Sequence, residues 1–363
     1  MRDELSSLDI HYMVEELQVL KEGKVEKVYQ WDDEDVFIIK IYASGETHNL
    51  RFKLPGVMYR TKKRFRAPRM PPGYARFLRK KLTAARIKAV RQKGFDRIVE
   101  FDIHSRRHGD LTLIYEAFKP SNLLLVDQET NKIIHPYKRQ SFRDRKIESK
   151  AEYAYPPLQP DISAMNNEQL EELFAPEDRV EKTLATTFGL GGLYAQEVTE
   201  RLGLASDALF KDATPTEVIA ATKSLLENPE PNVVGDEAYP VRLESKPEPE
   251  SVHESFSEAI DNVITQSQVI QTVKQRKKQN KKKWEVIIDA QQKQIRSFQD
   301  KIEQNKAKAE YLYEHYNDFA ELIYRLREAR NNPERFQDLL NSLDSYVDWD
   351  PKNDTVTLSF DES

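Results

Sequence analysis

The last third of the chain carries a repeat of apolar residues that limits what it can fold into. Apolar side chains recur at alternating spacings of four and three, first over residues 256–270 and again over 284–326. In a helix this spacing places them on one stripe, which is the seam of a coiled coil. The repeat predicts a coiled-coil helix over residues 254–330. Pro333 then predicts a break before a coiled-coil middle segment over 331–363.

A coiled-coil helix needs a partner, and this chain contains one long heptad segment. Two interpretations remain open: two copies pair as a homodimer through the seam, or the returning helix is absent from this chain. Lys274, Lys277 and Lys281 occupy seam positions between the two apolar runs, where packing must loosen. A stability role is hard to assign to them, so the cluster is interpreted as an RNA-backbone patch. It includes Lys277, Lys278, Lys281 and Lys282.

Residues 1–160 are predicted to form an α+β domain. An amphipathic helix is expected to begin near Ser6 to Asp9, where Ser or Asp can cap its first N–H groups. Helix and antiparallel strands in this order are typical of α+β folds. Alternation predicts strands at 25–30, 36–42, 48–54, 98–104, 110–116, 122–127 and 132–137, with a basic helix at 73–88.

Residues 165–250 are predicted to form a helix-hairpin-helix domain with a small strand pair. Gly189, Gly191 and Gly192 lie in a short turn between two helical stretches, which is the sequence form of that motif. Exposed amides at the start of a helix can hold a backbone phosphate, so these glycines are candidates for contact with an RNA backbone. The strand pair is expected at residues 233–234 and 240–243.

Charge is segregated along the chain, although the total is acidic. The sequence holds 56 Lys and Arg against 61 Asp and Glu, yet residues 60–93 contain fourteen basic residues and no acidic one. A charge run is usually a solvated helix face, but a stable face normally carries some Glu for pairing four residues apart. This run therefore favours contact with a nucleic acid. The candidate binding residues in it are Arg69, Arg76, Arg79, Lys80, Lys81 and Arg86.

Several kinds of site and protein are not expected. The chain has no cysteine and its seven histidines are scattered, so we expect no metal site. It contains no nucleophile elbow and no phosphate or dinucleotide loop, so no catalytic residue and no cofactor is expected. No apolar run approaches the roughly 20 residues that cross a bilayer, and the charged N-terminus does not resemble a secretory signal. The expected location is the cytoplasm, without a membrane partner.

Four groups of residues resemble the NFACT family of ribosome quality-control proteins. The first is Leu8-Asp9-Ile10, and the second joins Pro71-Pro72, Phe77 to Leu82 and Phe95-Asp96-Arg97-Ile98. The third is Glu116 with Ser121 to Asp127, ahead of Tyr155-Pro156-Pro157, and the fourth is the glycine turn followed by Phe256 to Asp261. Each group is short, but together they keep the family's order and span almost the whole chain.

The resemblance implies a first domain with a fold like that of MutM-type DNA glycosylases, then a helix-hairpin-helix domain and a coiled coil. It also implies that the chain stops before the returning coil and a C-terminal RNA-binding domain. The implied activity is recognition of a large ribosomal subunit that holds peptidyl-tRNA, with recruitment of aminoacyl-tRNA for untemplated tailing. Asp9, Asp96 and Arg97 match positions that the family needs for tRNA-dependent tailing. Since the ribosome would perform peptidyl transfer, the resemblance implies a tRNA-binding factor and not an enzyme.

Two other functions remain open. A helix-hairpin-helix is also used by DNA-repair glycosylases and lyases, but the glycosylases with this fold carry a catalytic N-terminal proline where this chain has Arg2. Relatives have also been described as fibronectin-binding adhesins, against which the missing signal sequence argues. Cleavage of a duplex with an abasic site would distinguish the first function from tRNA binding, and cell fractionation would distinguish the second.

Overall fold

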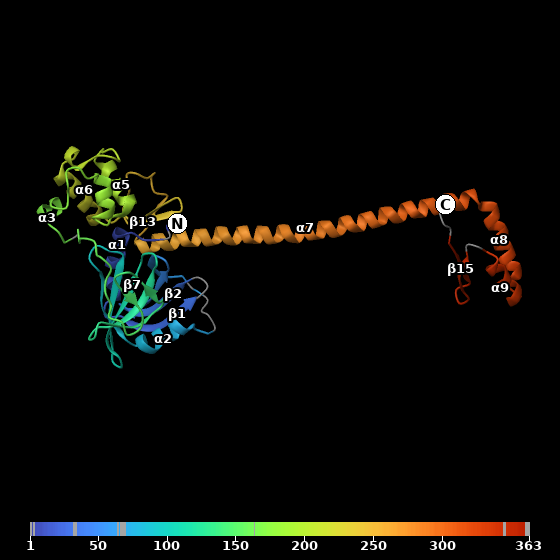
Figure 1. Ribbon diagram of the computed structural model, residues 1–363, viewed down its shortest axis with the longest axis horizontal. Helices are drawn as coiled ribbons and strands as arrows, with labels where there is room; N and C mark the ends of the chain where they lie inside the picture. The colour runs from blue at the N-terminus through green and yellow to red at the C-terminus, as the bar shows by residue number, and fades with distance from the viewer. Residues whose placement is uncertain are drawn as a thin grey trace. The chain divides into compact units, whose positions relative to one another are not determined.

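The computed structural model describes residues 2, 4–31, 35–63, 65, 70–162, 164–343 and 346–359, without the side chains of residues 267–280, 346 and 347. Contacts between residues divide the chain into two compact units, Met1–Thr272 and Val273–Ser363. Helix α7 (Phe256–Glu314) begins in the first unit and continues into the second (Figure 1). The first unit holds a large core inside a β-sheet domain and a second core among helices.

Within the described part of the first unit, nine antiparallel strands form one sheet in the order β4-β3-β2-β1-β5-β6-β7-β8-β9. Their bounds are β1 (Lys24–Trp31), β2 (Val36–Ala43), β3 (Glu46–Lys53), β4 (Val57–Thr61), β5 (Arg86–Gln92), β6 (Ile98–Ser105), β7 (Gly109–Glu116), β8 (Asn122–Asp127) and β9 (Lys132–Pro136). β1 and β5 share one register pair, Lys24 with Arg86. Phe52 on β3 contacts Phe101 on β6 and Tyr115 on β7 edge-on. Strands so distant in the order can touch only face to face, so the sheet folds at the β1–β5 joint into a sandwich.

The layer that contains β8 is covered on both faces. Leu123 and Leu125 belong to the core between the two layers, whereas Leu124 and Val126 belong to a separate apolar cluster on the outer face. Residues 142–155 cover that cluster, and they include one strand of a short hairpin, β10 (Gln140–Ser141) with β11 (Lys146–Ile147). Burial on both faces explains why this strand is a continuous apolar run in the sequence.

Two helices close opposite ends of the sandwich, as Figure 1 shows. α1 (Ser7–Leu17) starts with a capping box, in which the Ser6 hydroxyl accepts from the Asp9 N–H and the Asp9 carboxylate accepts from the Ser6 N–H. A 3-10 turn, Gln18–Leu20, follows it. α2 (Gly73–Leu82) is tied to the sandwich because the Tyr74 hydroxyl donates to the Leu123 carbonyl at 2.6 Å.

The second core lies among helices and also takes in one face of α1. The helices are α3 (Asn167–Glu171), α4 (Val180–Thr186), α5 (Gly191–Arg201), the 3-10 turn Phe210–Asp212 and α6 (Pro215–Glu227). Leu8 and Tyr12 of α1 belong to this core, so α1 lies between the sandwich and the helices. A small sheet follows, in which β12 (Asn232–Val234) lies between β13 (Glu237–Tyr239) and β14 (Ser251–Val252).

An acidic cap fixes the first turn of α7 to α1. The Glu16 carboxylate accepts hydrogen bonds from the N–H groups of Phe256 and Ser257, the second at 3.1 Å. A carboxylate at this end of a helix satisfies free amides and interacts favourably with the helix dipole. Phe256 and Ile260 then pack into the sandwich core.

The second unit contains the rest of α7, then α8 (Tyr316–Ala329), α9 (Pro333–Asn341) and a hairpin of β15 (Tyr346–Asp350) and β16 (Thr355–Leu358). The predicted break is confirmed, because Pro333 is the first residue of α9. The single helix expected over 254–330 is wrong at His315, which separates α7 from α8. The seam residues Trp284, Ile288 and Ile295 are exposed to 61%, 50% and 55%. Pairing of this seam, within one chain or between two copies, stays a prediction.

The seven strands expected from alternation are confirmed within two residues at their ends. The basic helix expected at 73–88 is wrong beyond Leu82, where a turn with Ala84 at φ 66° leads into β5. Ile87 and Val90 fill the sandwich core from that strand, so tertiary packing overrides the local helical pattern. The second strand of the predicted pair, at 240–243, is also wrong, since β12 pairs with β13 and β14.

Replacing Glu16 with alanine should destabilise the first unit, because two N–H groups of α7 lose their acceptor. We expect the free energy of unfolding to fall by about 1 to 2 kcal/mol in urea denaturation followed by circular dichroism. Glu15→Ala is the matched control, since the Glu15 side chain is exposed and lies 3.6 Å from His11. Equal losses in the two variants would contradict the role of Glu16 as a cap.

Candidate nucleic-acid interface

The turn of residues 94–97, between β5 and β6, is bound directly to the start of α1. The side-chain amide of Gln92 donates to the Ser7 carbonyl at 2.9 Å and to the Asp96 carbonyl at 2.8 Å. One side chain on β5 therefore holds both the helix start and the turn. The structure thus brings the Asp96-Arg97 pair beside the helix that carries Asp9.

The glycine turn between α4 and α5 packs against the same place. Gly189 has a φ of +70°, and a Cβ atom on it would lie 3.3 Å from the Phe95 carbonyl oxygen and 3.2 Å from the Gln159 side chain. A left-handed backbone with so close a neighbour requires glycine. Gly191, at φ +77°, lies near Ser6. Two helices flank this turn as expected, while its assignment as a helix-hairpin-helix stays a prediction.

Arg97 is a partly exposed cation of this site. Its side chain is 37% exposed, and its Nη1 lies 2.9 Å from Glu4 Oε2. Lys119 Nζ lies 2.9 Å from the other oxygen of the same carboxylate. The Asp96 carboxylate accepts the backbone N–H of Arg97 at 2.6 Å, which fixes the shape of the turn. One carboxylate therefore faces two cations at a partly exposed edge.

Asp9 is fully buried and has no surface with which to contact RNA. Arg2 donates to it through Nη1 at 2.8 Å and Nη2 at 3.0 Å, and the Tyr194 hydroxyl donates at 2.6 Å. Burial, together with the Asp9 carboxylate, raises the pKa of Tyr194 well above its ordinary value, so the phenol keeps the proton that it donates. Arg2 also donates to the Ala238 carbonyl at 2.7 Å. Asp9 thus joins the N-terminal arm, α1, α5 and β13.

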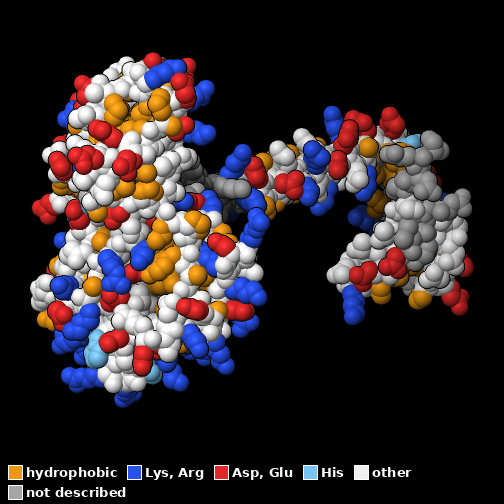
Figure 2. All heavy atoms as spheres, turned by 60° about the vertical axis from the view of Figure 1, so that its left-hand side comes forward, with side chains coloured by type: hydrophobic (Ala, Val, Ile, Leu, Met, Phe, Trp, Pro, Cys, Tyr) orange, Lys and Arg blue, Asp and Glu red, His pale blue; other side chains and the backbone are white. Residues whose placement is uncertain are grey.

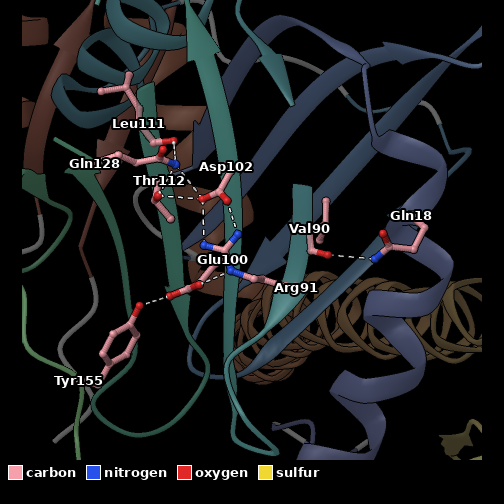
Figure 3. Close-up of polar contacts among 9 residues, drawn as sticks. All are labelled: Gln18, Val90, Arg91, Glu100, Asp102, Leu111, Thr112, Gln128 and Tyr155. Atoms are coloured by element: carbon pink, nitrogen blue, oxygen red, sulfur yellow. Dashed lines mark hydrogen bonds and ion pairs between the residues drawn. The ribbon is translucent and has the colours of Figure 1, made fainter. Parts of the chain in front are cut away.

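A polar network on the outer face of the sheet supports the β5–β6 hairpin (Figure 3). Arg91 Nε donates to Glu100 at 2.8 Å, and its Nη2 donates to Asp102 at 3.1 Å. The Tyr155 hydroxyl donates to the other oxygen of Glu100, which is 1% exposed. On the opposite side, Gln18 of α1's extension donates to the Val90 carbonyl at 2.9 Å. The hairpin that carries the turn is therefore braced from both sides, and Tyr155 anchors the segment that leads to Gln159.

The structure gives the basic run more partners than its sequence suggests. Arg79 Nε donates to the Val28 carbonyl at 2.6 Å, and its guanidinium lies 5.4 Å from the Tyr29 ring. Arg86 lies on β5 and donates to the Glu22 carbonyl, while Lys88 pairs with the Glu22 carboxylate at 3.1 Å. The run contains no acidic residue, but other segments supply carboxylates to its strand residues: Glu22 pairs with Lys88, and Glu100 and Asp102 pair with Arg91.

The other predicted contact residues are dispersed. Arg76 and Lys80 are exposed on α2, with Lys81 partly exposed beside them. Arg69 lies outside the described residues, as do the side chains of Lys277 and Lys278. Lys281 and Lys282 are exposed on α7 in the second unit, and Lys281 lies 3.9 Å from Glu285. Gly192 is exposed in the first turn of α5.

Among the described residues, no group of three or more His, Asp or Glu side chains is placed to hold a metal ion. His104 instead pairs with Asp110 at 2.6 Å, and His108 Nε2 lies 3.2 Å from the Lys80 carbonyl. None of the described helices is long and apolar enough to span a membrane.

Three features together define a class of protein. They are a sandwich closed by α1, a β5–β6 turn with an Asp-Arg pair, and an adjacent glycine turn. Residues 6–356 match the family model for the NFACT N-terminal and middle domains. The chain therefore belongs to the NFACT family.

Three known proteins illustrate the similarity. An archaeal Rqc2 homologue, aRqcH of Methanocaldococcus jannaschii, is 28% identical over 359 residues, which cover 91% of this chain and 53% of that protein. The NEMF homologue of Drosophila melanogaster, described as a ribosome quality control complex subunit, is 30% identical over 144 residues, 38% of this chain and 14% of that protein. The N-terminal structure of the fibronectin/fibrinogen-binding protein from Streptococcus suis matches with a TM-score of 0.62 and 25% identity, over 72% of this chain and 100% of that one. The chain spans about half the length of the archaeal relative.

Sequence reasoning missed four residues that shape the site: Glu4, Gln92, Lys119 and Tyr194. Glu4 reaches Arg97, and Lys119 reaches Glu4, from segments distant in the chain, and no local pattern marks them. Tyr194 follows the glycine turn, so its burial is readable from the apolar face of α5, but its bond to Asp9 is not.

Tyr194→Phe removes a donor from the buried Asp9 carboxylate without changing the ring. We expect the free energy of unfolding to fall by about 2 kcal/mol, because a hydrogen bond to a charged group contributes about 1.5 to 3 kcal/mol. Tyr12→Phe is the matched control, since the Tyr12 hydroxyl donates to the uncharged Leu225 carbonyl. Its expected loss is about 1 kcal/mol. A loss for Tyr194→Phe no larger than this would contradict the role of the Asp9 carboxylate at the centre of the network.

Proposed function

We propose that this protein is a ribosome-associated quality-control factor of the cytoplasm. It binds stalled large ribosomal subunits that carry peptidyl-tRNA, and it recruits aminoacyl-tRNA for untemplated C-terminal tailing. Family membership and the description of the Drosophila relative as a ribosome quality control complex subunit support this role. The observation that carries it is the Asp96-Arg97 turn, which presents a partly exposed guanidinium on a braced hairpin.

In this proposal Arg97 binds a phosphate of tRNA. A guanidinium offers two parallel N–H donors to a phosphate, and the Glu4 carboxylate occupies that place in the free protein. RNA phosphates would displace Glu4, and Lys119 would contribute a second positive charge. The Glu4 carboxylate keeps the Arg97 guanidinium oriented until an RNA phosphate takes its place.

Asp9 takes part as a positioning residue. Its carboxylate holds the Ser6 N–H at the start of α1, and Gln92 holds the Ser7 carbonyl together with the turn that carries Arg97. Loss of Asp9 would therefore disturb tRNA binding by moving the turn, without any contact between Asp9 and RNA. Peptidyl transfer would stay with the ribosome, so the proposal assigns no bond-making step to this chain.

Arg97→Ala should weaken tRNA binding about tenfold, because an Arg–phosphate pair is a strong charge-assisted contact. The slope of log affinity against log salt should also fall by about one. Fluorescence anisotropy with labelled tRNA measures both quantities. Lys182→Ala is the control, since Lys182 is exposed on α4. Unchanged tRNA affinity for Arg97→Ala would contradict the proposed contact between Arg97 and a tRNA phosphate.

Glu4→Gln should act in the opposite direction, because it removes the carboxylate that competes with phosphate for Arg97 and Lys119. We expect tRNA affinity to rise by roughly threefold to tenfold at low salt, and the gain to shrink as salt increases. The double variant Glu4→Gln with Arg97→Ala should lose most of that gain. A weaker affinity for Glu4→Gln would show that Glu4 is not a competitor of RNA.

One observation favours a second candidate function. The similar solved structure from Streptococcus suis is that of a fibronectin/fibrinogen-binding protein. Surface plasmon resonance with fibronectin tests this function on the same preparation that is used for tRNA. Tight binding to fibronectin without binding to tRNA would replace the first proposal.

The DNA glycosylase or lyase function has less support. In such an enzyme the residue at the N-terminus attacks the substrate, whereas here the Arg2 side chain is held by Asp9 and its guanidinium lies 4.9 Å from the Tyr239 ring. Incubation with a duplex that carries an abasic site should leave the DNA intact.

A further inference from the structure

The end of the sandwich opposite α1 joins two basic segments that are separate in the sequence. His108 lies in the turn between β6 and β7, and its Nε2–H donates to the Lys80 carbonyl at 3.2 Å. Its Nδ1 lies 3.4 Å from Lys81 Nζ, which fits an acceptor nitrogen facing an ammonium. This histidine joins the turn that carries Arg106 and Arg107 to the last turn of α2, and both arginine side chains are exposed.

The cations gathered at this end have few acidic partners. In the described part of the chain, Arg76, Lys80, Arg106 and Arg107 make no ion pair with a carboxylate. Asp110 pairs with His104 at 2.6 Å. Asp127 accepts from the N–H and the hydroxyl of Thr130, each at 2.9 Å. Those hydrogen bonds lower the pKa of the Asp127 carboxyl, and Lys81 is close enough to help lower it. Figure 2 shows Lys and Arg side chains gathered at the lower end of the first unit, which is the α2 end in Figure 1.

A purely structural explanation accounts for only part of this cluster. Lys80 and Lys81 lie in the last turn of α2, where positive charge interacts favourably with the helix dipole. Arg106 and Arg107 lie in a strand–strand turn, so the dipole gives no reason for them. Like charges held together cost free energy in the absence of a counterion, and a bound polyanion removes that cost.

The cluster also stands apart from the Asp96-Arg97 turn. Arg97 precedes the first residue of β6, and Arg106 follows its last. Nine residue steps of extended chain, at about 3.3 Å each, separate the two by roughly 30 Å. The basic run therefore does not form one surface with Arg97, and the two groups meet different parts of a ligand or different ligands.

We propose that Arg76, Lys80, Lys81, Arg106 and Arg107 form a second RNA site, which binds the sugar–phosphate backbone of double-helical RNA. The proposal rests on the proposed function only in taking RNA as the partner. The aromatic residues of α2 face inward, since Tyr74 is 7% exposed and stacks on Phe77. Base stacking is therefore not available to Tyr74, and exposed Lys and Arg contact phosphates without reading sequence. A duplex supplies phosphates at regular intervals, which suits a rigid cluster of cations.

The test compares wild type with a double variant that combines Arg106→Glu and Arg107→Glu. Anisotropy is measured with a labelled blunt RNA duplex across a salt series, and circular dichroism checks the fold. We expect duplex affinity to fall at least about tenfold and the salt slope to fall by about two. The control combines Arg179→Glu and Lys182→Glu, which make the same charge change on exposed residues of the α4 region. It should bind the duplex as wild type does.

Arg97→Ala separates this inference from the proposed function. It should leave duplex affinity unchanged while it weakens tRNA binding. If the Arg106–Arg107 variant binds the duplex like wild type, or the control loses as much affinity, the second site is wrong and the proposed function is untouched. If wild type binds vesicles that contain phosphatidylserine but not the duplex, the surface is a membrane site and the RNA assignment is overturned. If the Arg106–Arg107 variant loses duplex binding while Arg97→Ala leaves tRNA affinity unchanged, the second site is supported and the proposed tRNA contact of Arg97 is overturned.

Discussion

The Asp9 carboxylate has no exposed surface, and it joins the N-terminal residues around it to α5, which is distant in the sequence. Arg2 comes from the N-terminal arm, Tyr194 from α5, and the Ser6 N–H from the start of α1. A buried charge is costly unless it is fully paired, so each of these partners is needed once the carboxylate is buried. The relative placement of the sandwich, the helices and the glycine turn follows from this one group.

That placement supports the proposed contact between an RNA phosphate and a site with little exposed charge. The turn that carries Arg97 is held by Gln92, by the network around Glu100 and by the packing of Gly189 against Phe95. A cation fixed in advance loses little conformational entropy when a phosphate binds it. The α2 end of the sandwich differs, because several exposed cations lie close together there and are not fixed by ion pairs with the described carboxylates.

The limits of sequence reasoning are clearest along residues 73–92. The periodicity there is helical past Leu82, yet Ile87 and Val90 complete the sandwich core from a strand. Local propensity is worth tenths of a kcal/mol per residue, whereas burial of such a side chain is worth about 1.5 to 3 kcal/mol. The core therefore decides the conformation of this segment. The same reasoning covers Arg86, which the core places on β5 and so beside Glu22.

By itself the sequence determined seven of the nine described strands of the sandwich, the helical pattern of the last third, the break before Pro333 and the family, because periodicity, proline and ordered motifs are local properties. It also marked Asp9, Asp96, Arg97 and the glycine turn as candidates. Only the tertiary structure decided that Asp9 is buried while Arg97 is accessible, and that Arg106 and Arg107 join the end of α2. Burial and neighbouring charge depend on packing between segments far apart in the chain, and no local pattern records which segments meet.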